Sequence, residues 1–416
     1  MCGWTHRLSL ALLVLIALSV RLQGQWMTVV AADGTGDFAT VAEAVRSLPP
    51  GEDRKVIFIK NGVYTEKIRL TRSNVTLRGE SREGTILQFN QKSDDFTKNP
   101  DSIGRAVINI EADDIIIEGM TIVNTNPEIG PHAFTILGRG TRTVILNCNV
   151  WSKGADTVSL WNKEEGMYYH ADCDFRGSVD FVCPRGWCFI RDSKFYEERR
   201  SAAIWHDGSF AEDQKFVIRN SQFDGVDSFY LGRHHWDAQF YLIDCTFSAR
   251  MNENPIFRKT YPEEPARDRP FNWGPRYYFY NCHKTGGDYA WHADNLSTAD
   301  PTLKPESITP EWTFAGKWDP EAQNQPQING HDIEGHNLTL TFSEPVSAFG
   351  RPVLKGKRGR KFTYRSGSGG LTLTFTANKP FTEADLNNLK MIGKERIVAS
   401  AASAVERPVR LSFGRN

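Results

Sequence analysis

The sequence has no excess of either charge, because 50 Lys and Arg residues balance 50 Asp and Glu residues. Proteins that bind nucleic acid through phosphate contacts usually carry a basic excess, so the composition gives no reason to expect such a partner. Long apolar runs are also missing. The run from Leu8 to Val20 has 13 residues, a membrane-spanning helix needs about 20, and no other segment is long enough. With 40% hydrophobic and 12% aromatic residues, the chain is globular rather than disordered, collagenous or multi-span.

Two motifs of common enzyme classes are absent as well. No Gly-x-Ser-x-Gly motif occurs, which argues against a serine esterase of the α/β-hydrolase kind. The glycine-rich stretch Ser366 to Gly370 lacks the Lys-Ser/Thr of a phosphate-binding loop and is predicted to be a turn between strands.

The N-terminus is typical of a secretory signal peptide. Arg7 precedes the short apolar run, and a polar stretch ending at Gly24 follows it. We therefore predict a signal peptide over residues 1–24 and a secreted or periplasmic protein. A short membrane anchor is the alternative.

One short pattern recurs along the chain: Asn or Asp, then Cys or Ser, then any residue, then Phe or Val. Copies begin at Asn147, Asp172, Asp192, Asn220 and Asp244, and Asn281 begins it again. The intervals are 25, 20, 28, 24 and 37 residues, and β-rich stretches precede the copies. Irregular periods in the twenties without helical periodicity predict a parallel β-helix, in which equivalent residues stack about 4.8 Å apart.

The pattern also explains most of the seven cysteines. Cys2 lies in the predicted leader, and the remaining six are not spaced like a small disulfide-stapled scaffold. The four cysteines of the repeat are predicted to form a buried inward ladder: Cys148, Cys173, Cys245 and Cys282. Cys183 and Cys188 are close enough to bridge or to pack independently.

A second ladder lies eight or nine residues after the first. Asp156 follows Asn147 by 9 residues, and Asp180 follows Asp172 by 8, so both carboxylates should occupy equivalent places on adjacent turns. Two such carboxylates cannot both ionise cheaply, so we expect one pKa to rise and the other to fall. One aspartate can then donate a proton while the other acts as nucleophile or base.

Arg233 falls at the end of a strand two turns beyond Asp180 and can reach back to hold a carboxylate with its bidentate fork. The structural alternative is that both aspartates cap strand starts and that Arg233 is a surface cation. A metal site at His206-Asp207 with His234-His235 is a further alternative, although its spacing matches no ligand signature.

Several separated segments resemble the pectin methylesterase family. They are Gly36-Asp37-Phe38, the helix-like Val41 to Leu48, Gly62 to Lys67, Val75 to Glu80, Gly119 to Thr125, Asp156-Thr157, Gly177 to Val182 and Tyr230 to Arg233. The resemblance covers about residues 29 to 322, with the motifs in the family's order. It implies an all-β fold, a right-handed parallel β-helix over residues 25–322, acting on methyl-esterified polygalacturonate without a metal or other cofactor.

The resemblance also implies roles for individual residues. Asp180 becomes the nucleophile on the ester carbonyl, Asp156 the acid that protonates methoxide and then activates water, and Arg233 the residue that orients Asp180. Substrate contacts are expected at His132, Phe181, Trp205, His235 and Trp236. Here the arginine motif reads Arg233-His234-His235-Trp236, so either Trp236 or His235 takes the place of the family's sugar-stacking tryptophan.

The chain departs from the family where polar donors near the developing oxyanion are expected. Ala155 replaces a glutamine directly before Asp156, and His132 aligns with a second glutamine. Loss of one such donor costs about 2.7 to 4 kcal/mol of transition-state stabilisation. His132 can supply an N–H donor from the neighbouring turn or be structural. The loop after the nucleophile is changed as well, to Cys183-Pro184-Arg185-Gly186-Trp187-Cys188.

A second domain is predicted after a polar linker at residues 323–326. Alternating strands at Leu338 to Phe342, Leu371 to Phe375 and Val409 to Phe413 predict a small β-sandwich over residues 327–416, resembling immunoglobulin-like modules. This segment has 14 Lys or Arg against 7 Asp or Glu, so the rest of the chain is acidic by the same amount. The basic loop Lys355 to Lys361 either attracts an anionic polysaccharide or cell surface, or is simply solvated.

Taken together, these features predict a secreted carbohydrate esterase that demethylates pectin, most simply as a monomer. The alternatives are a β-helix that binds acidic glycans with weak or altered esterase activity, for example on acetyl esters, and a polysaccharide lyase. Pectin or a related acidic plant polysaccharide is the expected partner.

Overall fold

The computed structural model describes residues 27–52, 54–268, 270–321, 328–349, 351–368, 370–386, 389–392 and 396–399. The predicted signal peptide with Cys2, the linker 323–326 and the predicted strand Val409 to Phe413 lie outside the described residues. Within the described ranges, no helix combines the length and the apolar character that crossing a bilayer requires.

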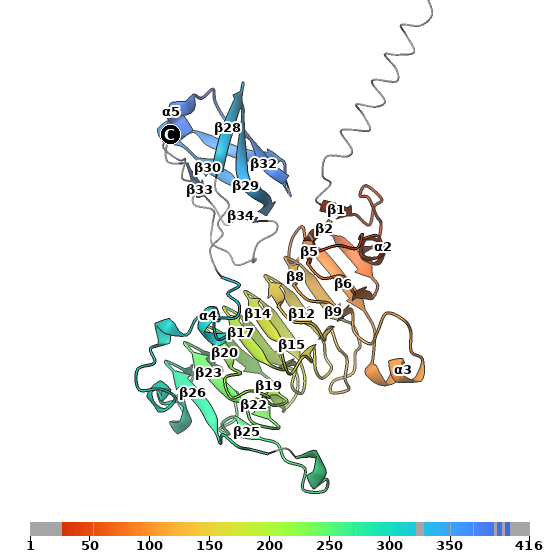
Figure 1. The fold of residues 1–416 in the computed structure, drawn as a ribbon, viewed down its shortest axis with the longest axis vertical. Helices are drawn as coiled ribbons and strands as arrows, with labels where there is room; N and C mark the ends of the chain where they lie inside the picture. Colours follow the sequence, from red (N-terminus) through yellow and green to blue (C-terminus); the bar gives the residue numbers. More distant parts are fainter. Residues whose placement is uncertain are drawn as a thin grey trace, which may run out of the picture.

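Three parallel sheets wind around one axis and confirm the predicted parallel β-helix (Figure 1). The ten-strand sheet contains β1 (Met27–Val30), β2 (Lys55–Ile59), β5 (Val75–Gly79), β8 (Ile115–Glu118), β11 (Thr143–Leu146), β14 (Met167–Ala171), β17 (Trp187–Arg191), β20 (Phe216–Arg219), β23 (Gln239–Ile243) and β26 (Arg276–Tyr280). The nine-strand sheet contains β3 (Gly62–Thr65), β6 (Thr85–Phe89), β9 (Thr121–Asn124), β12 (Asn149–Trp151), β15 (Asp174–Gly177), β18 (Lys194–Glu197), β21 (Gln222–Gly225), β24 (Thr246–Phe247) and β27 (His283–Lys284). The eight-strand sheet contains β4 (Ile68–Leu70), β7 (Ile108–Ile110), β10 (Ile136–Gly138), β13 (Val158–Leu160), β16 (Val182–Pro184), β19 (Ala202–His206), β22 (Tyr230–His234) and β25 (Phe257–Arg258).

The repeated Asn/Asp-Cys/Ser pattern marks the corner between the ten-strand and nine-strand sheets. The first residue of each copy has a positive φ, from 46° at Asn220 to 54° at Asp172 and Asp244. Asn and Asp tolerate this left-handed conformation better than other non-glycine residues, which explains why they recur there. At each corner this one residue changes the direction of the chain, and the side chain of the next residue points inward.

The inward side chains stack into the predicted core. Phe175, Phe195, Phe223 and Phe247 form a ladder in which neighbouring ring centroids are 5.5, 4.3 and 5.5 Å apart. All six described cysteines are buried and free. The inward cysteine ladder is therefore confirmed, and Cys183 and Cys188 pack independently rather than forming a bridge.

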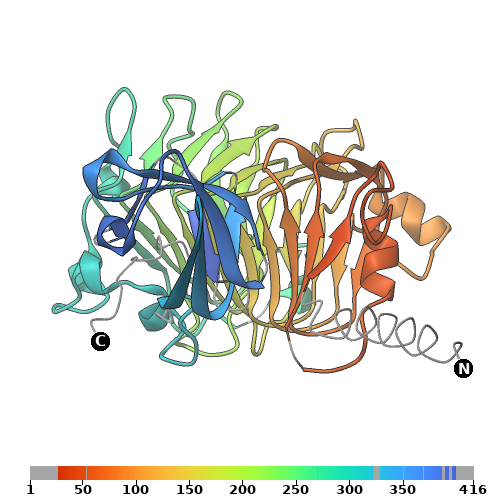
Figure 2. The same ribbon diagram turned by 90° about the horizontal axis from the view of Figure 1, so that it is seen from above.

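Short helices cover the first coils and part of the ten-strand sheet. Helix α2 (Val41–Arg46) lies within the predicted helix and buries Val41 and Ala44 against the first coils. Further along the solenoid, helix α4 (Pro310–Thr313) packs against β17 on the face of the ten-strand sheet, and Ile308 and Phe314 join an apolar cluster there. A third helix, α3 (Ser93–Lys98), interrupts an early coil. Figure 2 shows the coils following one another from red to green along the axis.

The C-terminal segment forms a separate antiparallel sheet with its own core around Leu340, Phe362 and Phe375. Its elements are β28 (Ile328–Glu334), β29 (Asn337–Phe349), β30 (Val353–Lys355), β31 (Lys361–Ser366), β32 (Gly370–Ala377), helix α5 (Glu383–Leu386), β33 (Lys390–Ile392) and β34 (Arg396–Ala399). The turn predicted at Ser366 to Gly370 joins β31 to β32. The immunoglobulin-like identity of this sheet stays a prediction.

Candidate active site

Asp156 and Asp180 lie two residues before β13 and β16, which are neighbours in the eight-strand sheet. Both have a φ of 58°, so each turns the chain into its strand in the same way. The backbone N–H of Asp156 donates to the carbonyl of Val179 at 3.2 Å. The two aspartates therefore occupy equivalent places on adjacent coils, as the repeat predicts.

Arg233 lies on β22, two coils beyond Asp180, and reaches back across β19. Its Nε donates to Oδ1 of Asp180 at 2.9 Å, and its Nη2 donates to Oδ2 at 2.7 Å. The guanidinium thus forms a bidentate pair with the carboxylate. The alternative in which Arg233 is only a surface cation is therefore wrong. The Asp180 side chain is only 11% exposed.

Burial governs the electrostatics of both carboxylates. Desolvation raises the pKa of Asp180 to about 6, with Arg233 opposing the rise and Asp156 adding to it. Desolvation also raises the pKa of Asp156, while His132 and Arg185 oppose that rise. The expectation that one pKa rises and the other falls was therefore wrong in its second half, because burial disfavours the charged form of both groups.

His132 stands beside the open side of Asp156. Its Nε2 is 3.8 Å from Oδ1 of Asp156, and its side chain is 59% exposed. Its backbone forms an isolated parallel bridge with Ala155, whose side chain is buried. The imidazole is thus placed where an N–H donor can face a ligand that approaches Asp156.

A buried polar group behind Asp156 was not singled out by the sequence. Ser159 donates to Oδ2 of Asp156 at 3.3 Å, and Trp161 donates its indole N–H to Ser159 at 2.6 Å. Arg185 lies next to Ser159 and donates to Asp207 at 3.2 Å. The signal that could have found this group is the pairing of adjacent coils, since Ser159 and Cys183 are register partners.

Glu197, at the end of β18, is a second group that sequence reasoning missed. Its Oε1 accepts the backbone N–H groups of Val179 at 3.2 Å and Arg199 at 3.0 Å. Val179, directly before Asp180, has a φ of 52°, which is rare for a β-branched residue. Burial raises the pKa of Glu197 to about 9, so a neutral carboxylic acid supports the turn that carries Asp180.

Most of the predicted substrate contacts are buried, and Trp236 is partly exposed. Phe181 is fully buried in the solenoid core, so its side chain cannot contact a ligand beside the aspartates, which corrects that expectation. The turn is the reason, because Val179 and Asp180 have left-handed backbone conformations before β16, and the chain after them places Phe181 and Val182 in the core. Trp205 and His235 are mostly buried and stacked at 6.4 Å.

Trp205 supports Arg233, whose guanidinium carbon lies 5.4 Å from the indole centroid. Trp236 is partly exposed, with the Lys163 ammonium 4.2 Å from its ring and Phe210 edge-on at 5.8 Å. The stacking role predicted for Trp236 or His235 therefore fits the accessible indole of Trp236 better than the imidazole, which Asp268 holds at 3.2 Å.

The histidines of the metal alternative are turned to separate partners. His206 is buried and bonded to the carbonyl of Gly186 at 3.0 Å. His234 contacts the Tyr277 hydroxyl, and His235 faces Asp268. These side chains do not converge on one point.

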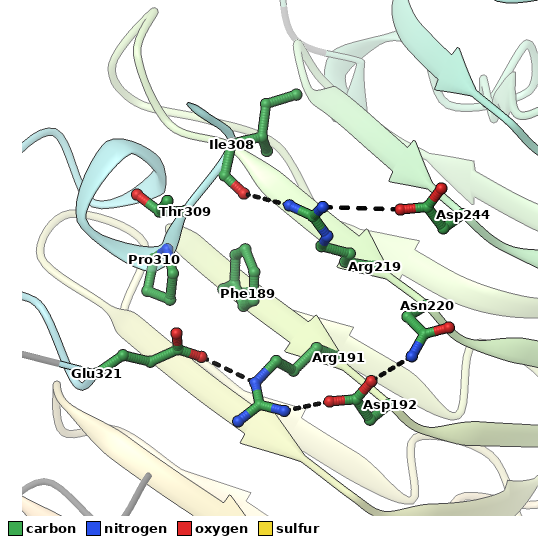
Figure 3. A pocket seen from close by; sticks show the side chains of 10 residues that line it. All are labelled: Phe189, Arg191, Asp192, Arg219, Asn220, Asp244, Ile308, Thr309, Pro310 and Glu321. Atoms are coloured by element: carbon green, nitrogen blue, oxygen red, sulfur yellow. Dashed lines mark hydrogen bonds and ion pairs between the residues drawn. The ribbon is translucent and has the colours of Figure 1, made fainter. Parts of the chain in front are cut away.

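A different hollow, of about 540 Å³, lies between the ten-strand sheet and the segment that carries α4 (Figure 3). Its two guanidinium groups are already engaged: Arg191 pairs with Asp192 and with Glu321 at 2.8 Å, and Arg219 pairs with Asp244 at 3.7 Å. The pair of Arg191 with Glu321 fastens the covering segment to the solenoid, and Arg219 does the same by donating to the carbonyl of Pro305 at 3.0 Å. Both arginines belong to a different sheet from the aspartate pair.

Comparison with known proteins finds similarity to pectinesterases. A family model described as pectinesterase matches residues 27–224. Probable pectinesterase/pectinesterase inhibitor 17 of Arabidopsis thaliana is 28% identical over 199 residues, covering 47% of this chain and 37% of that protein. Probable pectinesterase 56 of the same plant is 32% identical over 160 residues, covering 38% and 53%. The match thus spans about half of these relatives or less.

Solved structures show the same fold. Pectin methylesterase PemA from Erwinia chrysanthemi is 21% identical with a TM-score of 0.58, covering 71% of this chain and 98% of that chain. The carrot pectin methylesterase is 20% identical with a TM-score of 0.55, covering 70% and 93%. A pectin methylesterase in complex with a hexasaccharide is 20% identical with a TM-score of 0.55, covering 71% and 98%.

Proposed function

We propose, on the premise that the solenoid of this chain belongs to the pectinesterase family of carboxylic ester hydrolases, that the protein hydrolyses methyl esters of pectin. The observation that carries the proposal is the bidentate hold of Arg233 on Asp180, beside the Asp156 of the adjacent coil. An oriented carboxylate next to a second carboxyl group that stays protonated is what nucleophilic ester cleavage requires.

In the proposed reaction, an ionised oxygen of Asp180 attacks the ester carbonyl carbon. The tetrahedral intermediate collapses as the bond to methoxide breaks, and Asp156 gives methoxide its proton, so methanol leaves. The product of this step is an anhydride between the substrate carboxyl group and Asp180. Asp156, now ionised, takes a proton from water as the water oxygen attacks the anhydride, which regenerates both aspartates and frees the acid product.

The elevated pKa of Asp156 suits this sequence of steps. A carboxyl group whose pKa is raised by burial holds its proton more readily and can act as the acid, and the same group can act as the base once it is ionised. Arg233 keeps Asp180 ionised against the effect of burial. His132 is the donor best placed to meet the charge that develops on the ester oxygen, because its Nε2 lies beside Asp156.

Ala155 supports a second candidate, a glycan-binding solenoid with weak or altered esterase activity, for instance on acetyl esters. A buried methyl group cannot donate a hydrogen bond to an oxyanion, and each missing donor costs a factor of about 10²–10³ in rate.

Export is also part of the proposal, since the apolar run between Arg7 and Gly24 is typical of a signal peptide.

The test is release of methanol from methyl-esterified pectin by the full chain, with acetylated pectin and fully de-esterified polygalacturonate as comparison substrates. Asp180→Asn is expected to abolish release. Asp172→Asn is the matched control, because Asn occupies the equivalent corner at Asn147 and Asn220, and it should keep the activity. Equal release by Asp180→Asn and the unchanged protein would sink the proposal. Acetate release without methanol would favour the second candidate, and an unsaturated product would indicate a lyase.

A further inference from the structure

The Ser159 hydroxyl group lies at the centre of a buried polar cluster behind Asp156, and the Ser159 side chain has no exposed surface. Four polar atoms surround its Oγ: Trp161 Nε1 at 2.6 Å, Cys183 Sγ at 3.1 Å, Asp156 Oδ2 at 3.3 Å and Arg185 Nη1 at 3.5 Å. Of this cluster, only the carboxyl group of Asp156 takes part directly in the proposed reaction.

The chemistry of the neighbours decides where the single hydroxyl proton points. The indole N–H of Trp161 and the guanidinium of Arg185 can only donate, so the Ser159 oxygen must accept from both. The Cys183 thiol has other acceptors, which are the carbonyl of Val158 at 3.3 Å and the carboxyl group of Asp156. The Ser159 proton is thereby left for Oδ2 of Asp156, which is the strongest acceptor in the cluster when it is ionised.

Arg185 is held in place from its far side. Its Nε donates to Asp207 at 3.2 Å, and Lys163 pairs with the same carboxylate at 2.6 Å. Its guanidinium carbon lies 5.1 Å from the centroid of Trp161. The donors that fix the Ser159 oxygen are thus themselves fixed by an ion pair and by ring packing.

We infer that Ser159 is a positioning residue that keeps Oδ2 of Asp156 as an acceptor and so places the dissociable proton of Asp156 on Oδ1. Oδ1 is the oxygen that lies beside the exposed His132, on the side from which a substrate can approach. The proton is then delivered to the leaving methoxide from one defined oxygen, and taken back from water by the same one. This inference rests on the proposed esterase function for its catalytic meaning.

The experiment compares the full chain with Ser159→Ala, which removes the hydroxyl group, and Ser159→Thr, which retains it. Removing the hydrogen bond to ionised Asp156 raises the pKa of that carboxyl group by about one unit. The alkaline limb of the pH profile of kcat/KM for methanol release should therefore move up by about one pH unit in Ser159→Ala. The acidic limb, set by Asp180, should stay in place, and Ser159→Thr should restore the profile of the unchanged protein.

Trp161→Phe provides a second variant that leaves Ser159 intact. Loss of the indole N–H frees a lone pair on Oγ and lets the hydroxyl group rotate, so the same limb should move in the same direction by a smaller amount. If Ser159 and Trp161 only stabilise the fold, these variants should have a lower melting temperature, and the alkaline limb should not move by itself. An alkaline limb that stays in place in a folded Ser159→Ala or Trp161→Phe protein overturns the inference.

Infrared titration of the protonated carboxyl group separates this inference from the proposed function. The band that disappears in Asp156→Asn reports the pKa of Asp156 without any turnover. If the protein releases no methanol, the esterase proposal fails, and the band still decides whether Ser159 acts on Asp156. A higher titration midpoint in Ser159→Ala supports that placement of the proton, and an unchanged midpoint refutes it.

Discussion

Arg233 binds the two oxygens of Asp180 unequally. Oδ2 accepts from Nη2 at 2.7 Å and from Nε at 3.3 Å, whereas Oδ1 accepts only from Nε, at 2.9 Å. An oxygen with fewer donors keeps more of its electron density available. Oδ1 is therefore the better placed nucleophile, and Oδ2 is the anchored oxygen.

Arg233→Lys tests the value of this bidentate hold. Lysine keeps the positive charge but cannot contact both oxygens at once. Loss of one hydrogen bond to a charged group is expected to lower kcat/KM for methanol release about tenfold to a hundredfold. It should also move the acidic limb of the pH profile upward, because Arg233 opposes the rise in the pKa of Asp180. Arg250→Lys, at an exposed pair with Asp224, is the control, and equal activity of the two variants would contradict the assignment.

His132→Ala tests the donor beside Ala155. If the imidazole N–H meets the developing oxyanion, kcat should fall by a factor of about 10²–10³ with little change in KM. The measurement is steady-state kinetics on methyl-esterified pectin. His336→Ala, an exposed histidine of the C-terminal sheet, should leave both constants unchanged. A His132→Ala variant with normal kcat would assign the histidine a structural role.

Glu197→Gln tests the neutral acid that supports the turn at Val179. The folded protein holds the Glu197 proton up to a pKa of about 9, whereas an unfolded chain releases it near pH 4.3. The folded state therefore binds more protons between these values, and its stability relative to the glutamine variant falls as the pH rises. Relative to Glu197→Gln, the unchanged protein should lose about 1.4 kcal/mol of unfolding free energy for each pH unit between about pH 5 and 8.

Urea unfolding at pH 5, 6, 7 and 8 measures this slope. Glutamine retains an oxygen that can accept from Val179 and Arg199, so the variant should fold. The neighbouring Glu198 is partly exposed, and Glu198→Gln should show no comparable slope. Parallel stability curves for Glu197→Gln and the unchanged protein would show that Glu197 is ionised in the folded state.

The inward cysteine ladder predicts a particular pattern of thiol reactivity. Burial raises the pKa of Cys148 to about 12 and that of Cys173 well above its ordinary value. The thiolate is the reactive form, so these two cysteines should react slowly with a thiol reagent at pH 8 in the native protein. Unfolding in denaturant should expose all six described cysteines as free thiols. Recovery of two fewer thiols than the number of cysteines in the protein would point to a disulfide bond.

The residues that could be predicted from the sequence are those repeated in every coil. The Asn/Asp corner and the inward cysteine recur at visible intervals, so the solenoid, the aspartate pair and the reach of Arg233 follow from counting. The inward side chain of Phe181 does not follow from this counting, because the left-handed turn at Val179 and Asp180 before β16 sets its direction.

The surroundings of Asp156 could not be predicted in the same way. Ser159, Arg185 and Asp207 occur once each in their places, and their contacts depend on which long side chains cross between coils. The shared rise in pKa of the two aspartates also depends on burial, which the repeat does not reveal. These are properties of packing between coils rather than of the pattern within one.

The three charged residues of the site are carried by separate coils of the solenoid, which fixes the distances between them. Asp156, Asp180 and Arg233 come from different coils, so their spacing along the axis is set in steps of about 4.8 Å. Changes in the length of a loop leave those steps intact, because the loops project away from the stacked strands. One additional coil between β16 and β22 would instead carry Arg233 a full step further from Asp180 and break the pair. The site should therefore keep its geometry when a loop is lengthened and lose it when the number of coils between its residues changes.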